Sequence, residues 1–164
     1  MNRKGYTLVE VLAVVAILGI LSGVATMAVS HYLSKTREKA FENNRENICV
    51  GVKDAILESP TQSDFQAVGI VSTIAQSLVN SFSKVRNGEN YTFTHSAVYL
   101  VKTGYINELT SPINKSENCN GSMYKLQSEK SVENNGINSY RCYVKLYCGS
   151  KWIDNDFVEV NINE

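Results

Sequence analysis

The sequence predicts an α+β fold, in which one long amino-terminal helix packs on a small antiparallel sheet that carries a second helix. Up to residue 58, a long apolar run continues without a Pro into a segment with helical period. After Pro112 the period changes to two, which is typical of half-buried strands. The chain has 164 residues, enough for one modest domain behind such a helix.

Residues 6–30 are the apolar half of the predicted helix. Arg3 and Lys4 precede it, residues 11–34 carry no charge, and one acid, Glu10, lies at its front. About 20 apolar residues cross a bilayer core of roughly 30 Å, and basic residues before the span stay in the cytoplasm. A charge in that core costs about 2.5–3.5 kcal/mol, so we expect Glu10 to be functional.

Two general interpretations of this front compete. A secretory signal peptide needs a small-residue cleavage site after the apolar run, and residues 25–27, Ala-Thr-Met, are a poor one. A plain transmembrane anchor accounts for the apolar length. It leaves Glu10 and the junction Lys4-Gly5-Tyr6 unexplained.

Residues 4–12, Lys-Gly-Tyr-Thr-Leu-Val-Glu-Val-Leu, resemble the class III leader of type IV prepilins and pseudopilins. The resemblance implies that a prepilin peptidase cuts after Gly5, so that residues 1–5 are the leader peptide. It also implies that Tyr6 becomes the first mature residue and is N-methylated; the family usually has Phe there, and both residues are aromatic. It further implies the pilin architecture, in which the long helix is the spine of the head.

Glu10 matches the acid at the fifth mature position of that family. The resemblance implies that residues 6–30 assemble in the apolar core of a filament, where a carboxylate is tolerated only if it is paired. The candidate partner is the amino terminus of a neighbouring subunit at Tyr6, and the Thr7 hydroxyl can help to satisfy the carboxylate. The alternative is a Glu10 carboxyl that stays protonated or reaches the cytoplasmic interface.

Residues 31–58 are the amphipathic half of the predicted helix. Apolar residues recur there every three or four positions, and the opposite side is charged. We expect the apolar side to lie on the sheet of the head and the charged side to be solvated. The helix stops at Glu58-Ser59-Pro60, which starts the globular head.

The globular head, residues 59–164, is predicted to contain a helix at about 63–83. Its apolar residues have helical spacing, and Ser63 with Gln66 resembles a capping box. Residues 96–103 are expected to form a shorter helix. The expected strands are 91–94, 122–129, 139–148 and 157–162.

The four cysteines are even in number and lack C-x-x-C spacing, which favours disulfides over a zinc site in an exported domain. A hairpin that turns near Asn134 brings Cys119 close to Cys148, so we expect these two to be bonded. A second pair, Cys49–Cys142, requires the helix to cross the sheet at that level, and two buried thiols are the alternative. Four buried or free thiols are the alternative to both bonds.

Composition and motifs exclude several classes of function. Acids and bases balance at 16 each, and the nucleotide-binding, hydrolase and metalloprotease motifs are absent from the sequence. We therefore expect no enzyme, cofactor or metal; Asp154 and Asp156 lack the rest of a calcium loop and indicate a solvated turn. No cluster of Lys and Arg with aromatics stands out, so nucleic acid is not an expected partner.

The sequence thus predicts a type IV pilin-like structural subunit that is processed after Gly5 and assembles through residues 6–30 into a surface pilus or pseudopilus. Its partners would be the prepilin peptidase and other pilin subunits. Before assembly it would lie in the membrane as a single-pass protein with a cytoplasmic amino terminus and an extracellular head. The alternative is a minor pilin, or a competence or type II secretion pseudopilin, whose head binds DNA or a secreted protein.

Overall fold

The computed structural model of the chain describes residues 7–129 and 139–161. The chain divides into two compact units, Met1–Lys39 and Ala40–Glu164. The predicted turn near Asn134 and the predicted strand residue Ile162 lie outside the described residues.

Helix α1, Leu8–Glu58, is the long amino-terminal helix that the sequence predicts. The large apolar side chains that the structure describes in the first unit are exposed, with Leu8 81% and Ile20 70% accessible. Among the residues that the structure describes, no helix has the length and apolar character needed to cross a membrane.

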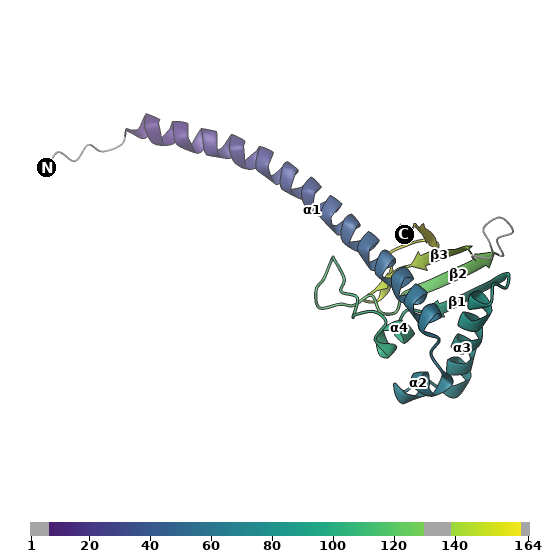
Figure 1. Ribbon diagram of the computed structural model, residues 1–164. Helices are drawn as coiled ribbons and strands as arrows, with labels where there is room; N and C mark the ends of the chain where they lie inside the picture. The colour runs from purple at the N-terminus through teal and green to yellow at the C-terminus, as the bar shows by residue number, and fades with distance from the viewer. Residues whose placement is uncertain (1–6, 130–138, 162–164) are drawn as a thin grey trace. The chain divides into compact units, whose positions relative to one another are not determined.

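In the second unit, α1 buries one side against the sheet. Ile48, Val52, Ala55 and Ile56 are 5% accessible or less, and this three-to-four-residue spacing is that of one helix face. Leu57, on the opposite side, is 68% accessible. The apolar side of the predicted amphipathic half is therefore the side that packs, and the prediction of a helix on a sheet is confirmed (Figure 1).

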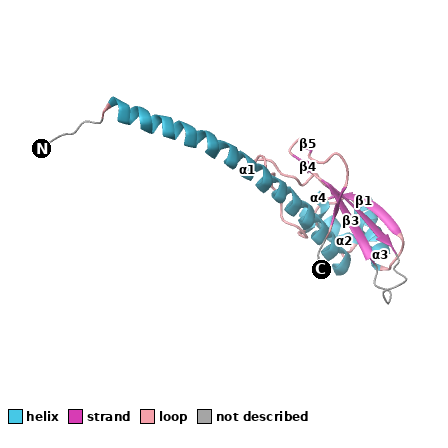
Figure 2. Cartoon of the chain, turned by 90° about the horizontal axis from the view of Figure 1, so that it is seen from above, coloured by secondary structure: helices cyan, strands magenta, loops and turns pink. Residues whose placement is uncertain are grey.

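Four strands form an antiparallel sheet in the order β1-β2-β3-β6 within the described residues (Figure 1). Even-numbered residues of β2 and β3 lie on the helix side, as the predicted alternation requires; all of them are buried except Tyr140, which is partly buried. Tyr147–Cys148 (β4) and Lys151–Trp152 (β5) form a separate ribbon (Figure 2). The strands of the main sheet are β1 (Tyr91–Ser96), β2 (Met123–Glu129), β3 (Ser139–Lys145) and β6 (Val158–Val160).

The single strand expected at residues 139–148 is wrong in its second half, because β3 ends at Lys145. The amide of Leu146 donates to the Asp154 carboxylate at 2.9 Å, and its carbonyl accepts from Ile153. Both bonds go to residues that follow β5, Ile153 and Asp154. The chain therefore turns away into the β4–β5 ribbon.

The helix expected at residues 63–83 is also wrong, because two helices occupy this region: α2 (Gln62–Ala67) and α3 (Ser72–Arg86). Gly69 follows the end of α2 with φ +78°. Its amide donates to Gln66 O, and the Ile70 amide donates to Phe65 O. These two bonds are a Schellman motif, which ends a helix where a left-handed glycine is present.

The cap of α2 also differs from the expected pair Ser63 and Gln66. Thr61 is the N-cap, and the Asp64 carboxylate accepts from the Thr61 amide at 2.7 Å. That backbone bond lowers the pKa of the Asp64 carboxyl. The pattern Thr-x-x-Asp lies two residues before the expected pair.

Aromatic side chains fill the space between α3 and the sheet. Phe93 on β1 meets Phe82 and Tyr124 edge-on, with ring centroids 5.9 and 6.2 Å apart. His95 lies beside them, and its ring nitrogen is 3.3 Å from Ser81 Oγ. Burial lowers the pKa of His95 to about 4, so this histidine is neutral within the core near pH 7.

A short helix, α4 (Val98–Thr103), ends at Gly104 with φ +81° and leads to residues that cross α1 closely. At the crossing, α1 has Gly51. A Cβ added there would overlap the Ile106 side chain and lie 3.3 Å from Tyr105 O. The absence of a side chain at Gly51 thus allows the crossing.

We expect Gly51→Ala to destabilise the head. Alanine gains about 1 kcal/mol in helix propensity, but the severe overlap with Ile106 costs about 2–3 kcal/mol in a packed core. The expected net loss is about 1–2 kcal/mol in the free energy of unfolding. Urea unfolding of the full chain in a mild detergent would measure it.

The matched control is Val50→Ala, one residue earlier on α1, where the side chain is 42% accessible. It should change the free energy of unfolding by about 0.5 kcal/mol or less. Equal stability of Gly51→Ala and the parent chain would contradict the close crossing.

Candidate functional site

The start of α1 carries a reciprocal hydrogen-bonded cap. Thr7 precedes the first helical residue, and Glu10 is the third residue of the helix. The Glu10 amide donates to Thr7 Oγ1 at 3.3 Å. In return, Glu10 Oε2 accepts from the Thr7 amide at 3.2 Å and from the Thr7 hydroxyl at 3.3 Å. This arrangement is a capping box.

The sequence favours this cap because Thr and Glu have the spacing that satisfies two free amides of the first turn. A carboxylate at this end also meets the positive end of the helix dipole. Both bonds from Thr7 reach the same oxygen, Oε2. Because Glu10 is exposed within its unit, the cap holds its carboxylate in an accessible position.

The predicted cleavage residues Gly5 and Tyr6 lie outside the described residues. Thr7 and Glu10, the two residues predicted to act in assembly, lie together in the cap. The sequence had suggested that the Thr7 hydroxyl helps to satisfy the acid, and the structure adds the two backbone bonds.

The first unit also exposes its apolar side chains at Val9, Leu12 and Leu21, which are 76%, 65% and 60% accessible. Gly19 lies among them, and an added Cβ there would meet nothing within 4 Å. Packing within the chain thus gives no reason for a glycine that costs about 1 kcal/mol in a helix interior. An exposed apolar helix of this kind is suited to packing against other helices.

A disulfide between Cys49 and Cys142 fastens α1 to β3, with the two Cα atoms 5.9 Å apart. Both residues are buried in the core. The bond spans 93 residues, so in the chain-entropy description it restricts the unfolded chain strongly. Helix α1 thus crosses the sheet with Cys49 beside Cys142 of β3, as this pairing requires.

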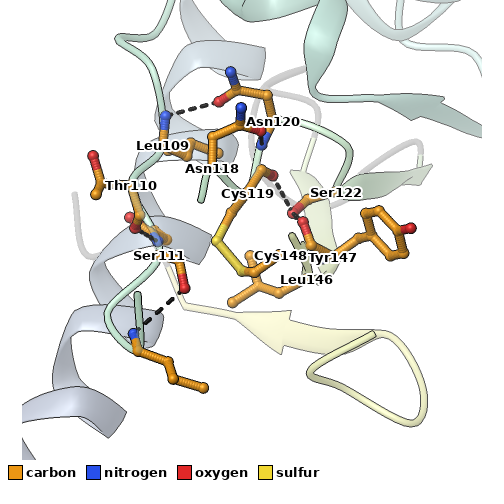
Figure 3. The surroundings of a disulfide bond; sticks show 12 residues. Leu109, Thr110, Ser111, Asn118, Cys119, Asn120, Ser122, Leu146, Tyr147 and Cys148 are labelled. Carbon is orange, nitrogen blue, oxygen red and sulfur yellow. Dashed lines mark hydrogen bonds between the residues drawn. A yellow bond between two sulfur atoms is a disulfide. The ribbon is translucent and has the colours of Figure 1, made fainter. Parts of the chain in front are cut away.

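A second disulfide joins Cys119 to Cys148, 29 residues apart (Figure 3). It connects the segment before β2 with the β4–β5 ribbon. The Ser122 hydroxyl donates to Cys119 O at 2.6 Å and accepts from the Tyr147 amide at 3.0 Å (Figure 3). This side chain therefore holds the same two segments together beside the bond.

The loop before Cys119 is held by polar contacts on its other side. The Leu109 amide donates to Asn120 Oδ1 at 2.8 Å, and the Cys119 amide donates to Leu109 O at 2.6 Å (Figure 3). Asn44 on α1 donates to Thr110 O at 3.1 Å. The loop is thereby fixed both to its own disulfide and to α1.

Asp154 was expected in a solvated turn, and this is wrong. Its carboxylate forms an ion pair with Arg45 of α1 and accepts from the Leu146 amide. The Asp154 side chain is 8% accessible and that of Arg45 is 17%. These residues are 109 positions apart, and no local pattern signals that they meet.

We expect Asp154→Asn to lower the free energy of unfolding by about 2–3 kcal/mol, because it leaves the Arg45 guanidinium partly buried without its anion. Asparagine can still accept from the Leu146 amide, so the loss reports the ion pair. A double-mutant cycle with Arg45→Gln, followed by thermal unfolding, would give the coupling energy.

The control is Asp156→Asn in the same turn, where the side chain is exposed and accepts from the neighbouring Phe157 amide. It should be neutral within about 0.5 kcal/mol. A coupling energy near zero between the Arg45 and Asp154 substitutions would show that the pair does not fasten α1.

Comparisons with known proteins find similarity at the amino terminus and over part of the remaining chain. Residues 1–26 match the family model described as "Prokaryotic N-terminal methylation motif". The chain is 33% identical over 98 residues to the "Fimbrial protein EcpC" of Eikenella corrodens. The similar region covers 56% of this chain and 61% of the relative. No solved structure matches the chain.

The motif covers the start of α1, where Thr7 and Glu10 form the cap. The fimbrial relative extends the similarity beyond that motif, and the fold is a long helix on a small antiparallel sheet. The matched motif and the similarity to a fimbrial protein both agree with the resemblance to type IV prepilins that residues 4–12 carry.

Proposed function

We propose that this chain is a structural subunit that is cut after Gly5 and assembles through the amino-terminal half of α1 into a pilus or pseudopilus. The observation that carries the proposal is the capped, exposed Glu10 carboxylate at the start of a helix whose apolar side chains are also exposed. Its role is structural and not catalytic. Its partners are the prepilin peptidase and further pilin subunits.

The Thr7–Glu10 cap prepares the carboxylate for an ion pair between subunits. The capping bonds from Thr7 use Oε2, and a carboxylate has a second oxygen, Oε1, that can accept from another group. Cleavage after Gly5 creates a positively charged amino terminus at Tyr6. Buried among apolar helices, Glu10 pairs with the terminus of a neighbouring subunit and sets the axial register.

Before assembly, we propose, residues 6–30 hold the subunit in the membrane, with its amino terminus in the cytoplasm and its head outside. This stage rests on the sequence, in which residues 11–34 carry no charge and Arg3 and Lys4 precede them. After assembly the head lies on the surface of the filament. The new amino terminus at Tyr6 is N-methylated.

The proposal is tested with Glu10→Gln, which removes the charge but keeps an oxygen that can accept from the Thr7 amide. We expect this variant to be processed but to enter filaments at least tenfold less than the parent chain, because the partner terminus loses its anion. Glu10→Val removes both the cap and the charge and should assemble no better. Immunoblots of sheared filaments and of membranes would measure both.

Two further variants separate processing from assembly. Gly5→Ala should accumulate as the uncut precursor and be absent from filaments. Thr7→Ser keeps the hydroxyl cap and should be processed and assembled normally. If Glu10→Gln enters filaments as well as the parent chain, the ionic role of Glu10 is wrong.

A further inference from the structure

The segment from the start of α2 to the end of α3, residues 62–86, is joined to the rest of the head without a covalent cross-link. No cysteine lies between Cys49 and Cys119, so both disulfides connect other parts of the chain. Among the described residues, neither ion pair involves α2 or α3. This α2–α3 segment is therefore held on the sheet by packing and hydrogen bonds, whereas α1 is cross-linked to β3.

The side of α3 that packs on the sheet has a polar residue in the middle of its apolar stripe. This residue is Ser81, which is 3% accessible, and its Oγ lies 3.3 Å from Nε2 of His95 on β1. A change at His95 therefore acts within the contact between α3 and β1 (Figure 1). The other buried residues of the stripe are apolar: Ala75, Leu78, Phe82 and Val85.

The described groups around the His95 ring are aromatic or basic. Its centroid is 5.2 Å from that of Phe93, and the register places Tyr124 of β2 directly opposite, with centroids 6.3 Å apart. Burial raises the pKa of the Tyr124 phenol, so this group offers no negative charge. On the α3 side, Lys84 Nζ lies 4.4 Å from the ring centroid of Tyr91, which adds a positive charge to the same interface.

A proton on His95 would therefore be poorly accommodated in the closed interface. Burial lowers the pKa of His95 from 6.5 to about 4, and no described carboxylate acts on the ring. From α4, the phenol of Tyr99 acts on Tyr124 and not on His95. With α3 away from the sheet, the ring is in water and its pKa returns to about 6.5. The stability of the closed form is thus complete above pH 6.5 and is lost as the pH falls towards 4.

We propose that acid releases α2 and α3 together from the sheet, with protonation of His95 as the trigger, while the disulfides keep the rest of the head assembled. A charged ring requires water or an anion, and an interface of this composition supplies little of either. Helix α2 moves with α3, because Gln62 donates to Ser72 at 2.8 Å and the Phe65 and Phe82 ring centroids are 6.4 Å apart.

The ends of the α2–α3 segment are held by bonds that do not depend on a histidine. Arg86, at the end of α3, donates to Ile56 O of α1 at 3.4 Å and to Ser59 Oγ. The Ser128 hydroxyl of β2 donates to Glu89 O at 2.6 Å. These bonds stay in place when the segment opens, so the opening is local and reversible.

The test is hydrogen–deuterium exchange of the full chain in a mild non-ionic detergent, read by mass spectrometry and corrected for the pH dependence of the intrinsic rate. Between pH 7.5 and 4.5, the protection of the α3 amides should fall about 50- to 100-fold, as the two pKa values of His95 require. The protection of the β2 and β3 amides should change less than about threefold. The protection of α3 should return when the pH is raised again.

His95→Gln keeps a side chain that can hydrogen-bond to Ser81 but cannot take up a proton in this range. Its α3 protection at pH 4.5 should stay within about threefold of that at pH 7.5. His95→Phe, which keeps an aromatic ring beside Phe93, should behave in the same way. The matched control is His31→Gln, because His31 is the other histidine of the chain and is exposed in the first unit. It should lose α3 protection as the parent chain does.

Unchanged protection of α3 in the parent chain at pH 4.5 would overturn the proposal. So would an equal loss of protection in β2 and β3, which would be unfolding of the whole head. If both His95 variants lost as much α3 protection as the parent chain, the response would belong to carboxyl groups and the proposal would be wrong. The outcome is independent of filament assembly, since the assay contains no filaments.

Discussion

The burial of one side of α1 on the sheet is the interaction on which the head depends. The side chains of Ile48, Val52 and Ala55 are fully buried there. The Cys49–Cys142 disulfide and the Arg45–Asp154 ion pair attach the same stretch of α1 at two further points. Apolar burial supplies most of the stability and has no direction, whereas the bond and the ion pair fix the register of the helix on the strands.

Within one helix, α1 combines two environments. Its residues in the second unit are buried by the sheet, and its apolar side chains in the first unit are exposed. An exposed apolar surface requires another surface to cover it. The capped Glu10 limits which surface can cover it, because a carboxylate in an apolar setting is stable only opposite a cation.

Much of this fold could be predicted from the sequence, since it depends on short-range patterns. The apolar run and the helical period before Pro60 determine α1, and the alternation around Tyr143 determines the sheet and its buried side. The leader motif at Gly5 and the spacing of Thr7 and Glu10 are equally local. Even the break at Gly69, which we did not predict, is a local signal, because glycine is the residue that a left-handed helix end requires.

Tertiary structure alone decided which distant polar groups meet. Arg45 and Asp154 are 109 residues apart, and each reads by itself as an exposed residue. Periodicity tells which side of an element is buried, but the register between elements arises only when the chain packs.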